Sequence, residues 1–374
     1  MNKNDRMTPM ERLNGFLTGG EMDRLLTMPL ICSMSGKCAG MTHREKRSTA
    51  ENEAKCQISA YERFGNDLLI VEYGLHGVGK ALGSVMNDPE DSVPVVIDHV
   101  LKSIDDFDNL DWSRAYLAND PSFQQHLDCA KILIEKMGSE VPTGVLVSGP
   151  FTAAASIYPT EKLLKATVRN PEFVAKLMRK CTDVLMEVHN EFIKAGAMIL
   201  LCEPIATGSI ISDKVFLNFV LPYLQEITDN VHAHGGMVCL HICGDTKKVL
   251  PLMVKAGADM ISIDNRVELE FGKSIIEKTV PLIGNVDPVD SMILGTPKDV
   301  ENAVKKCIQI GHDAQHGYIL STGCDLNGAV PLENLDAFMA AARKYGKLPI
   351  DSNLQDIICT RLKKIYSSSS AFAS

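Results

Sequence analysis

The sequence is poor in aromatic residues and lacks the long apolar runs of membrane proteins. Its 374 residues include one tryptophan. It contains no run of about 18 apolar residues, so we expect no membrane-spanning helix. Basic residues are not in excess either, because 38 Lys and Arg against 47 Asp and Glu give a formal net charge of -9. This balance argues against a nucleic-acid partner and against a polybasic membrane anchor. The polar start, MNKNDRMTPMERLNGF, has no apolar core of a signal peptide, and we expect a cytoplasmic protein.

Two further absences narrow the class of chemistry. No Gly-x-Gly-x-x-Gly string follows an early strand and no P-loop occurs, which disfavours nucleotide-dependent reactions. The eleven cysteines are not accompanied by a secretion signal. They therefore indicate a reducing compartment and free thiols rather than a disulfide framework. Most should be small core residues, which leaves only a few for a chemical role.

Short, continuous apolar runs recur along the chain and are typical of strands buried on both faces of a parallel sheet. Eight such runs occur, at 28–33, 67–72, 144–149, 198–203, 237–242, 260–263, 281–284 and 317–320. Helical patterns lie between them. One helix should begin at Ser48, which forms a capping-box pattern with Glu51. A second should span 170–196, and a third should run from after Pro297 to near Gly311. This alternation predicts an α/β fold, a (β/α)8 TIM barrel, with an open doubly wound sheet as the alternative.

The barrel domain should occupy residues 26–348. An N-terminal helical extension is expected over residues 1–25, where MERLNGFLTG has a helical pattern. The long gap at 75–143 should hold an inserted helical segment or a lid. Residues 349–374 should form a C-terminal helix and a disordered tail, because the chain ends in the low-complexity string YSSSSAFAS.

In such a barrel, functional side chains sit at the carboxyl ends of the strands. The chemistry-bearing residues at these ends are Glu72, Glu203, His241, Cys243, Asp264, Asn285, Asp287 and Cys324. His241 and Cys243 are two residues apart at one strand end, so both should point to the same side. Cys324 follows the last strand, whose end converges on the same rim. One histidine and two cysteines would form a three-ligand zinc site with an open fourth position.

The charge of this ligand set bears on the reaction. Two thiolates neutralise Zn²⁺ and leave a weak Lewis acid that can still lower the pKa of an incoming thiol. This favours alkyl transfer to sulfur over activation of water. A carboxylate such as Asp245 or Asp264 could orient His241 from behind. The competing interpretation is that these side chains only pack in the core, because a His-x-Cys string also arises by chance. Cys239 lies on the same face of the strand one layer deeper and is a poorer candidate ligand.

Several strings resemble those of one protein family. They are GPFTAAASIY (149–158), EPIATGSIIS (203–212), LHICGDT (240–246), GNVDPVDSMILGTPKDV (284–300) and GYILSTGCDLNGAVPLENLDAFMAAARKYG (317–346). Together they resemble the uroporphyrinogen decarboxylase superfamily, and within it the methylcobamide:coenzyme M methyltransferase branch. The resemblance implies a (β/α)8 barrel with zinc on His241, Cys243 and Cys324.

The resemblance also implies a function. In that branch a separate corrinoid protein supplies methylcobalamin, and the methyl group passes to a small acceptor such as the thiol of coenzyme M, or tetrahydrofolate. Glu203 would be a fourth zinc ligand that the substrate displaces, and Asp264 would be a second catalytic residue lining the pocket. The pocket facing the corrinoid would be lined by Asn285, Asp287, Glu72 and Tyr73. The sequence is compatible with a homo-oligomer.

Alternatives remain at this point. A corrinoid methyltransferase could instead take the methyl group from an organic donor, and a family member could decarboxylate a tetrapyrrole or only bind one. The stretch Met34-Ser35-Gly36-Lys37-Cys38-Ala39-Gly40 has no arginine where the decarboxylase pattern carries arginines that hold carboxylates. If the acceptor carries a sulfonate, Lys37 and Arg266 are rim cations that could bind it.

Overall fold

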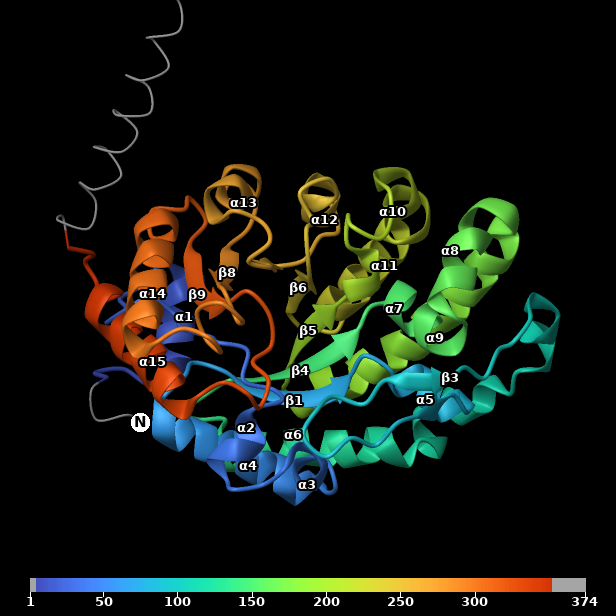
Figure 1. Ribbon diagram of the computed structural model, residues 1–374, viewed down its shortest axis with the longest axis horizontal. Coiled ribbons are helices and arrows are strands. Elements are labelled where there is room, and N and C mark those ends of the chain that lie inside the picture. Colours follow the sequence, from blue (N-terminus) through green and yellow to red (C-terminus); the bar gives the residue numbers. More distant parts are fainter. Residues whose placement is uncertain (1–4, 352–374) are drawn as a thin grey trace, which may run out of the picture.

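A curled sheet of seven parallel strands organises the chain in the computed structural model, which describes residues 5–351 (Figure 1). The strands are β1 (Leu69–Gly74), β4 (Thr143–Ser148), β5 (Met198–Cys202), β6 (Val238–Ile242), β7 (Met260–Ile263), β8 (Leu282–Val286) and β9 (Tyr318–Thr322). They pair side by side in this order. The prediction of an α/β fold with a parallel sheet is confirmed, and seven of the eight expected runs form its strands.

The expected strand at 28–33 does not form, which corrects the prediction of eight strands. Residues 26–28 lie extended beside β9, where Met28 N–H donates to the Leu320 carbonyl at 2.8 Å and Leu320 N–H donates to Leu26 at 3.0 Å. On the other side, Asp67 N–H donates to the Thr27 carbonyl at 2.9 Å, just ahead of β1. The segment therefore lies between the two edge strands of the sheet without forming a regular ladder with either.

A proline explains the interruption. Pro29 has no N–H to donate, and proline disfavours strand pairing inside a sheet. The next residue, Leu30, donates its N–H to the Thr322 hydroxyl at 3.1 Å instead of to a backbone carbonyl of β9. The apolar run predicted burial correctly, but it could not predict the broken ladder.

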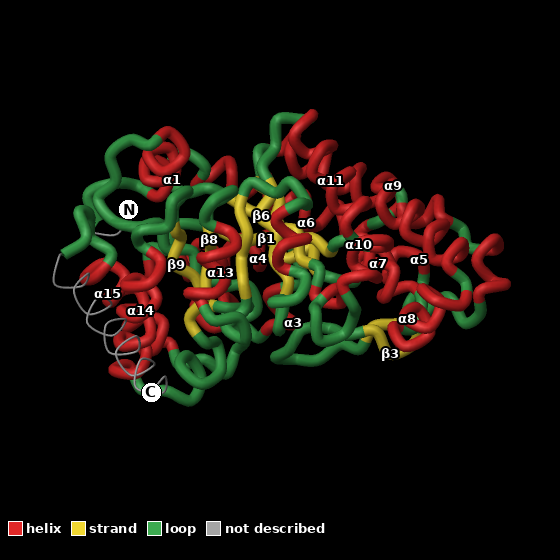
Figure 2. The backbone as a smooth tube through the Cα atoms, turned by 90° about the horizontal axis from the view of Figure 1, so that it is seen from above, coloured by secondary structure: helices red, strands yellow, loops and turns green. Residues whose placement is uncertain are grey.

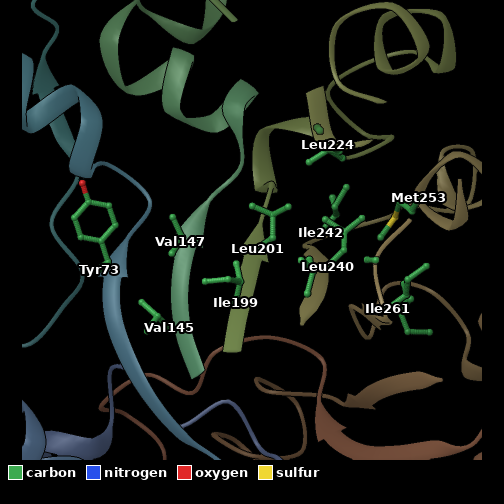
Figure 3. Packing of buried hydrophobic residues seen from close by; sticks show 14 of the residues in the cluster. Tyr73, Val145, Val147, Ile199, Leu201, Leu224, Leu240, Ile242, Met253 and Ile261 are labelled. Atoms are coloured by element: carbon green, nitrogen blue, oxygen red, sulfur yellow. The ribbon is translucent and has the colours of Figure 1, made fainter. Parts of the chain in front are cut away.

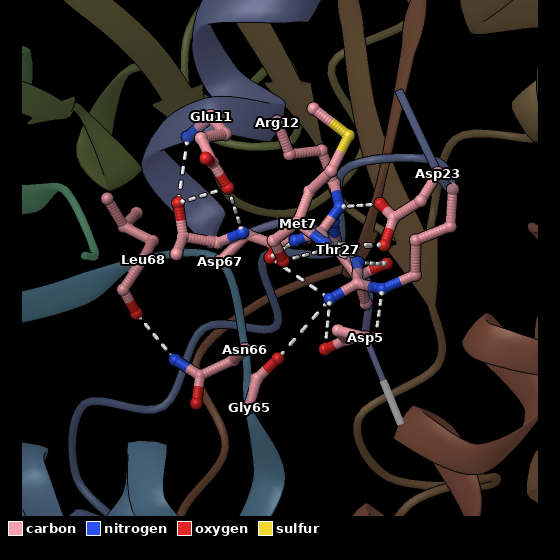
Figure 4. Close-up of polar contacts among 12 residues, drawn as sticks. Asp5, Met7, Glu11, Arg12, Asp23, Thr27, Gly65, Asn66, Asp67 and Leu68 are labelled. Atoms are coloured by element: carbon pink, nitrogen blue, oxygen red, sulfur yellow. Dashed lines mark hydrogen bonds and ion pairs between the residues drawn. The ribbon is translucent and has the colours of Figure 1, made fainter. Parts of the chain in front are cut away.

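Buried ion pairs hold this segment in place (Figure 4). The Arg12 guanidinium, fully buried, lies 2.8 Å from Asp23 and 2.5 Å from Asp67. Arg24 lies 2.6 Å from the other oxygen of Asp67 and 3.1 Å from Asp5. This cluster joins the N-terminal helix α1 (Pro9–Thr18) to the residues that precede β1.

Two apolar layers flank the sheet. Side chains of one parity along each strand, such as Val145, Val147, Ile199 and Leu201, pack outward against the helices (Figure 3). The other parity fills the inside of the curl, where Ile70, Leu200, Cys239, Met260 and Ile283 belong to one buried cluster. Strands buried on both faces read as continuous apolar runs, which is why the sequence revealed them.

The helices surround the outer face of the curl (Figure 2). Besides α1 they are α2 (Ser35–Cys38), α3 (His43–Lys46), α4 (Ala50–Phe64), α5 (Gly77–Leu82), α6 (Pro121–Met137), α7 (Pro150–Ile157), α8 (Thr160–Arg169), α9 (Pro171–Ala195), α10 (Asp213–Phe219), α11 (Leu221–Ala233), α12 (Leu250–Val254), α13 (Leu269–Ile276), α14 (Pro297–Gly311) and α15 (Leu332–Tyr345). The predicted limits of α9 and α14 are confirmed. The helix expected from Ser48 begins at Ala50, because Thr49 is the residue whose side chain caps it.

The insertion at 75–143 contains α5, α6 and a small two-stranded sheet of β2 (Val85–Met86) and β3 (Val96–Asp98). Short 3-10 helices follow, η1 (Ile104–Asn109), η2 (Trp112–Ala115) and η3 (Leu117–Asn119), and a fourth, η4 (Pro204–Ala206), comes after β5. The expected helical insertion is thus present. The helix and tail predicted for 349–374 fall outside the described residues from 352 onward. No helix in the described part combines the length and apolar character needed to cross a bilayer.

Candidate metal centre

The structure brings together His241, Cys243 and Cys324, as we expected from the sequence. His241 is near the end of β6, Cys243 directly follows that strand, and Cys324 follows β9. The His241 Nε2 atom lies 3.2 Å from the Cys243 sulfur, which lies 3.4 Å from the Cys324 sulfur. All three ligand atoms are within 4.8 Å of one another. Within the described residues this is the one such group of His, Cys, Asp and Glu side chains.

The geometry of the three atoms fits a tetrahedral zinc ion. Ligand atoms about 2.1–2.3 Å from zinc lie roughly 3.5–3.8 Å apart, close to the separations seen here. One nitrogen and two sulfur donors are also a set that zinc accepts readily. His241 is buried, whereas both cysteines are partly exposed. Three ligands leave one position of a tetrahedral ion for a further ligand.

The electrostatics of the group favour one ionised thiol. The hydrogen bond from Cys243 is the main cause that lowers the pKa of Cys324 to about 4, although burial opposes it. The same pairing, together with burial, raises the pKa of Cys243. Burial alone would lower the pKa of His241, but the neighbouring Cys324 raises it above its ordinary value. The pairing therefore favours ionisation of Cys324 over that of Cys243.

A hydroxyl rather than a carboxylate contacts the far side of His241. The Nδ1 atom lies 3.0 Å from the hydroxyl oxygen of Ser262, a buried residue of β7. Neither carboxylate that we expected to orient the ring does so. Asp264 instead accepts from the backbone N–H groups of Gly244 and Arg266. Asp245 accepts from the backbone N–H of Lys247, two residues further along the chain.

Glu203 is fully buried at the end of β5, but its carboxylate faces the start of α7. Its oxygens accept from the N–H groups of Phe151 at 3.0 Å and Thr152 at 2.5 Å, and from the Thr152 hydroxyl. Burial raises the pKa of Glu203 to about 7, although these hydrogen bonds oppose the shift. Glu203 is not in the group of three ligand atoms, and its role as a fourth ligand stays a prediction.

The other expected pocket residues are held by backbone contacts. Asn285 donates its amide to the carbonyls of Asp264 at 3.1 Å and Val267 at 2.8 Å. Asp287 accepts from the N–H groups of Val289 and Asp290, and its second oxygen accepts from Asn265. These side chains lie at the rim where the sequence placed them. Each shapes a loop in this structure, and contact with a corrinoid stays a prediction.

Glu72 and Tyr73 line a separate cavity of about 330 Å³ at the end of β1. Lys46 lies 2.8 Å from Glu72, and the His43 ring nitrogen lies 3.4 Å away. Burial would raise the pKa of Glu72, yet these two neighbours hold it well below its usual range. None of the three candidate metal ligands lines this cavity. The predicted site residues thus fall into two groups. Glu72 and Tyr73 line this cavity, whereas the three candidate metal ligands lie outside it.

Two polar residues near the metal group were not predicted. Ser262 is part of no recognisable motif. Only the register between β6 and β7 shows that it lies beside His241. Asp325 directly follows Cys324 and accepts from the Cys32 N–H at 3.0 Å and the Ser33 hydroxyl at 2.5 Å. Burial, followed by the nearby charge of Glu72, raises the pKa of Asp325 to about 7.

The remaining candidates are more ordinary. The ammonium group of Lys37, one of the two expected rim cations, donates to the carbonyls of Gly328 and Val330 and is thereby used by the fold. Cys239 points into the inner core, as expected. The ten cysteines among the described residues are free thiols.

Comparisons with known proteins bear on the family and the fold of the chain. Residues 8–345 match the model of a protein family described as Uroporphyrinogen decarboxylase (URO-D). A Methylcobamide:CoM methyltransferase MtbA of Methanosarcina acetivorans is 29% identical over 351 residues, which cover 90% of this chain and 98% of the relative. A Uroporphyrinogen decarboxylase of Geotalea daltonii is 26% identical over 82% of this chain and 88% of the relative. The solved structure of a methyltransferase from Methanosarcina mazei superposes with a TM-score of 0.78 at 23% identity, covering 91% of this chain and 99% of that one.

Proposed function

Because the chain belongs to the uroporphyrinogen decarboxylase family, we propose that it is a zinc-dependent corrinoid methyltransferase of that family. It would move a methyl group between a methylcorrinoid, presented by a partner protein, and a small thiol or tetrahydrofolate. The observation that carries the proposal is the convergence of His241, Cys243 and Cys324 within 4.8 Å. A relative that matches 90% of the chain is named for methyl transfer from a methylcobamide.

The donor set fits this reaction better than hydrolysis. Zinc held by two thiolates and one imidazole would lower the pKa of an incoming thiol without becoming a strong Lewis acid. His241 supplies its Nε2 atom from a buried position, so its ring is protected from solvent. Cys243 and Cys324 are partly exposed residues, and a substrate sulfur would approach the ion from their side.

The atoms of the proposed transfer balance without a further reactant. The acceptor thiol releases its proton to solvent, and its sulfur lone pair forms a bond to the methyl carbon. The cobalt–carbon bond breaks, and its electron pair stays on cobalt, which is reduced from Co(III) to Co(I). The corrinoid is thus a substrate brought to the site. In the reverse direction, or in a first half-reaction from an organic methyl donor, the electron pair of Co(I) forms the cobalt–carbon bond. The bond from the methyl carbon to the donor sulfur, nitrogen or oxygen then breaks, and its electron pair stays on the leaving group.

Decarboxylation is the second candidate, because decarboxylases are among the related proteins. It requires cationic anchors for several substrate carboxylates. The stretch at 34–40 supplies only Lys37 as a cation, and its ammonium group is bound to two backbone carbonyls. These features favour methyl transfer over decarboxylation of a tetrapyrrole.

The proposal is tested by incubating the zinc-loaded protein anaerobically with methylcobalamin and, separately, 2-mercaptoethanesulfonate, homocysteine or tetrahydrofolate. Loss of the methylcobalamin spectrum with one acceptor would identify the acceptor. A parallel incubation of Co(I) cobalamin with methylated thiols and amines tests the donor half-reaction. Absence of methyl transfer in both series, with and without lysate fractions that contain corrinoid proteins, would contradict the proposal.

A further inference from the structure

The strand pairing sets Ser262 directly beside His241. The two residues are Cα partners across the parallel pair β6 and β7, and both side chains point into the curl. The Nε2 atom of His241 faces the Cys243 sulfur, so a metal on that nitrogen leaves the proton on Nδ1. Nδ1 then donates to the Ser262 hydroxyl oxygen, 3.0 Å away. Ligating histidines commonly have such a partner, which fixes the tautomer and the ring plane.

Two residues further along, Asp264 holds the turn that carries Cys243. One carboxylate oxygen accepts from the Gly244 N–H at 2.8 Å and the other from the Arg266 N–H at 2.9 Å. Gly244 has a φ of 80°, a left-handed conformation that favours glycine. The charge-assisted bond from Asp264 fixes this turn directly after the ligand. Both oxygens are thus used, and the side chain is buried.

The loop that Asp264 begins also touches the turn of the third ligand. A Cβ atom added at Gly323 would lie only 2.5 Å from the backbone nitrogen of Asn265, so the two backbones are in close contact. Gly323 immediately precedes Cys324. The loop at 264–267 is itself fixed by the two amide hydrogen bonds from Asn285. One short segment is therefore packed against both cysteine-bearing turns, and Ser262 just before it contacts the histidine.

We infer that the carboxyl end of β7, Ser262 and the loop 264–267, is a positioning element that sets the metal ligands in place and contacts neither the metal nor the substrate. Ser262 orients His241, Asp264 fixes the Cys243 turn, and Asn265 supports the Cys324 turn. This assigns Asp264 and Asn285 a role different from the substrate-contacting one that the sequence suggested. The inference rests on the proposed metal site.

The physical consequence is a loss of metal affinity when a support is removed. Without the Ser262 hydroxyl, the imidazole can rotate and its Nδ1 proton lies buried without an acceptor. Loss of such an outer contact weakens metal binding about 10–100-fold in known sites. Ser262→Thr keeps a hydroxyl and should restore most of the affinity. Asp264→Asn keeps the shape but has only one oxygen for two N–H donors, so it should also weaken binding.

The test measures zinc affinity by competition with a chromophoric chelator, and the absorption bands of the Co(II)-substituted protein. Ser148→Ala is the matched control, because Ser148 is a buried serine of β4 whose hydroxyl has no hydrogen-bond partner within the described residues. Circular dichroism confirms that each variant is folded.

We expect Ser262→Ala and Asp264→Asn to bind zinc about tenfold or more weakly, with shifted Co(II) bands, while the control and Ser262→Thr stay within about threefold of wild type. If wild type binds zinc stoichiometrically and both variants match it in affinity and spectrum, the positioning role is refuted while the metal site stands. If wild type itself binds no zinc, the proposed function fails instead, and the positioning role fails with it.

Discussion

The sulfur atoms of Cys243 and Cys324 lie 3.4 Å apart, although 81 residues separate them in the chain. Cys243 follows β6 and Cys324 follows β9, and two further strands stand between these in the sheet. Only the inward curl of the sheet brings the two turns together. A pair of thiols this close, facing an imidazole nitrogen, has a direct chemical use in binding a soft cation.

The ligand assignment predicts the metal content of single variants. Alanine at His241, Cys243 or Cys324 should abolish stoichiometric zinc, because two remaining ligands cannot enclose the ion. Metal analysis after gel filtration measures this. Cys239→Ala is the control and should keep one zinc, because Cys239 lies on the same face of β6 as His241 but is part of the inner apolar cluster. Full zinc in the Cys324 variant would refute the assignment.

Removing the metal should leave the fold intact. The protein has an apolar core on both faces of its sheet, and this core does not include the three ligands. We therefore expect the far-UV circular dichroism to be unchanged by a chelator, unlike that of a zinc finger, while the melting temperature falls modestly. Loss of the helical signal on chelation would show instead that the ion is structural.

The N-terminal ion-pair cluster predicts sensitivity to acid (Figure 4). Burial would raise the pKa of Asp23, but the hydrogen bond and charge of Arg12 lower it from 3.8 to about 2. A carboxyl whose pKa is depressed by folding contributes stability above its unfolded pKa. That contribution is lost as the pH falls from about 4 toward 2.

Asp23→Asn should therefore lower the free energy of unfolding by about 3 kcal/mol at pH 7, since it leaves part of a buried charge unpaired. The difference from wild type should shrink as the pH approaches 2. Urea unfolding at several pH values measures both effects. Asp98→Asn removes the exposed pair with Lys102 and should leave the free energy of unfolding nearly unchanged, because surface ion pairs contribute little to stability. An Asp23 variant as stable as this control would contradict the prediction.

The buried His189 should make folding stability fall as the pH is lowered. Its side chain is fully buried in α9, and neither ring nitrogen has a hydrogen-bond partner among the described residues. Burial lowers its pKa from 6.5 to about 3. The folded protein thus keeps the ring neutral while the unfolded chain takes up a proton, so stability is lost as the pH falls below about 6.5.

His189→Leu should remove this loss. Its stability relative to wild type should grow by about 2–3 kcal/mol between pH 7 and pH 4.5, measured by chemical unfolding. His189→Gln separates the causes, because it stays polar but does not titrate. It should be less stable than the leucine variant at every pH, yet share its pH dependence relative to wild type. A constant difference between wild type and both variants would rule out the proton linkage.

Most of the sheet could be predicted from the sequence, because strands buried on both faces appear as apolar runs. The missing strand at 28–33 shows the limit of that signal: an apolar run predicts burial, whereas pairing also needs an N–H that Pro29 lacks. The convergence of His241, Cys243 and Cys324 was predictable because the ends of parallel strands meet at one rim and because the family resemblance implied these residues.

The surroundings of the ligands were less predictable. Ser262 is part of no recognisable motif. Its contact with His241 depends on the register between β6 and β7, which cannot be read from the sequence. Asp264, Asn285 and Glu203 were placed at the correct rim, but most of their hydrogen-bond partners are backbone groups of neighbouring loops or of the start of α7. Composition and spacing carry no information about such contacts.

The most direct test of the account compares three samples of one preparation in the anaerobic methylcobalamin assay, with the acceptor or donor identified above. They are the zinc-loaded protein, the chelated protein, and the chelated protein with zinc restored. We expect methyl transfer in the first and third samples and none in the second, and we expect the Cys324→Ala variant to be inactive under all three conditions. Equal rates in all three samples would contradict the claim that His241, Cys243 and Cys324 hold a zinc ion on which methyl transfer depends.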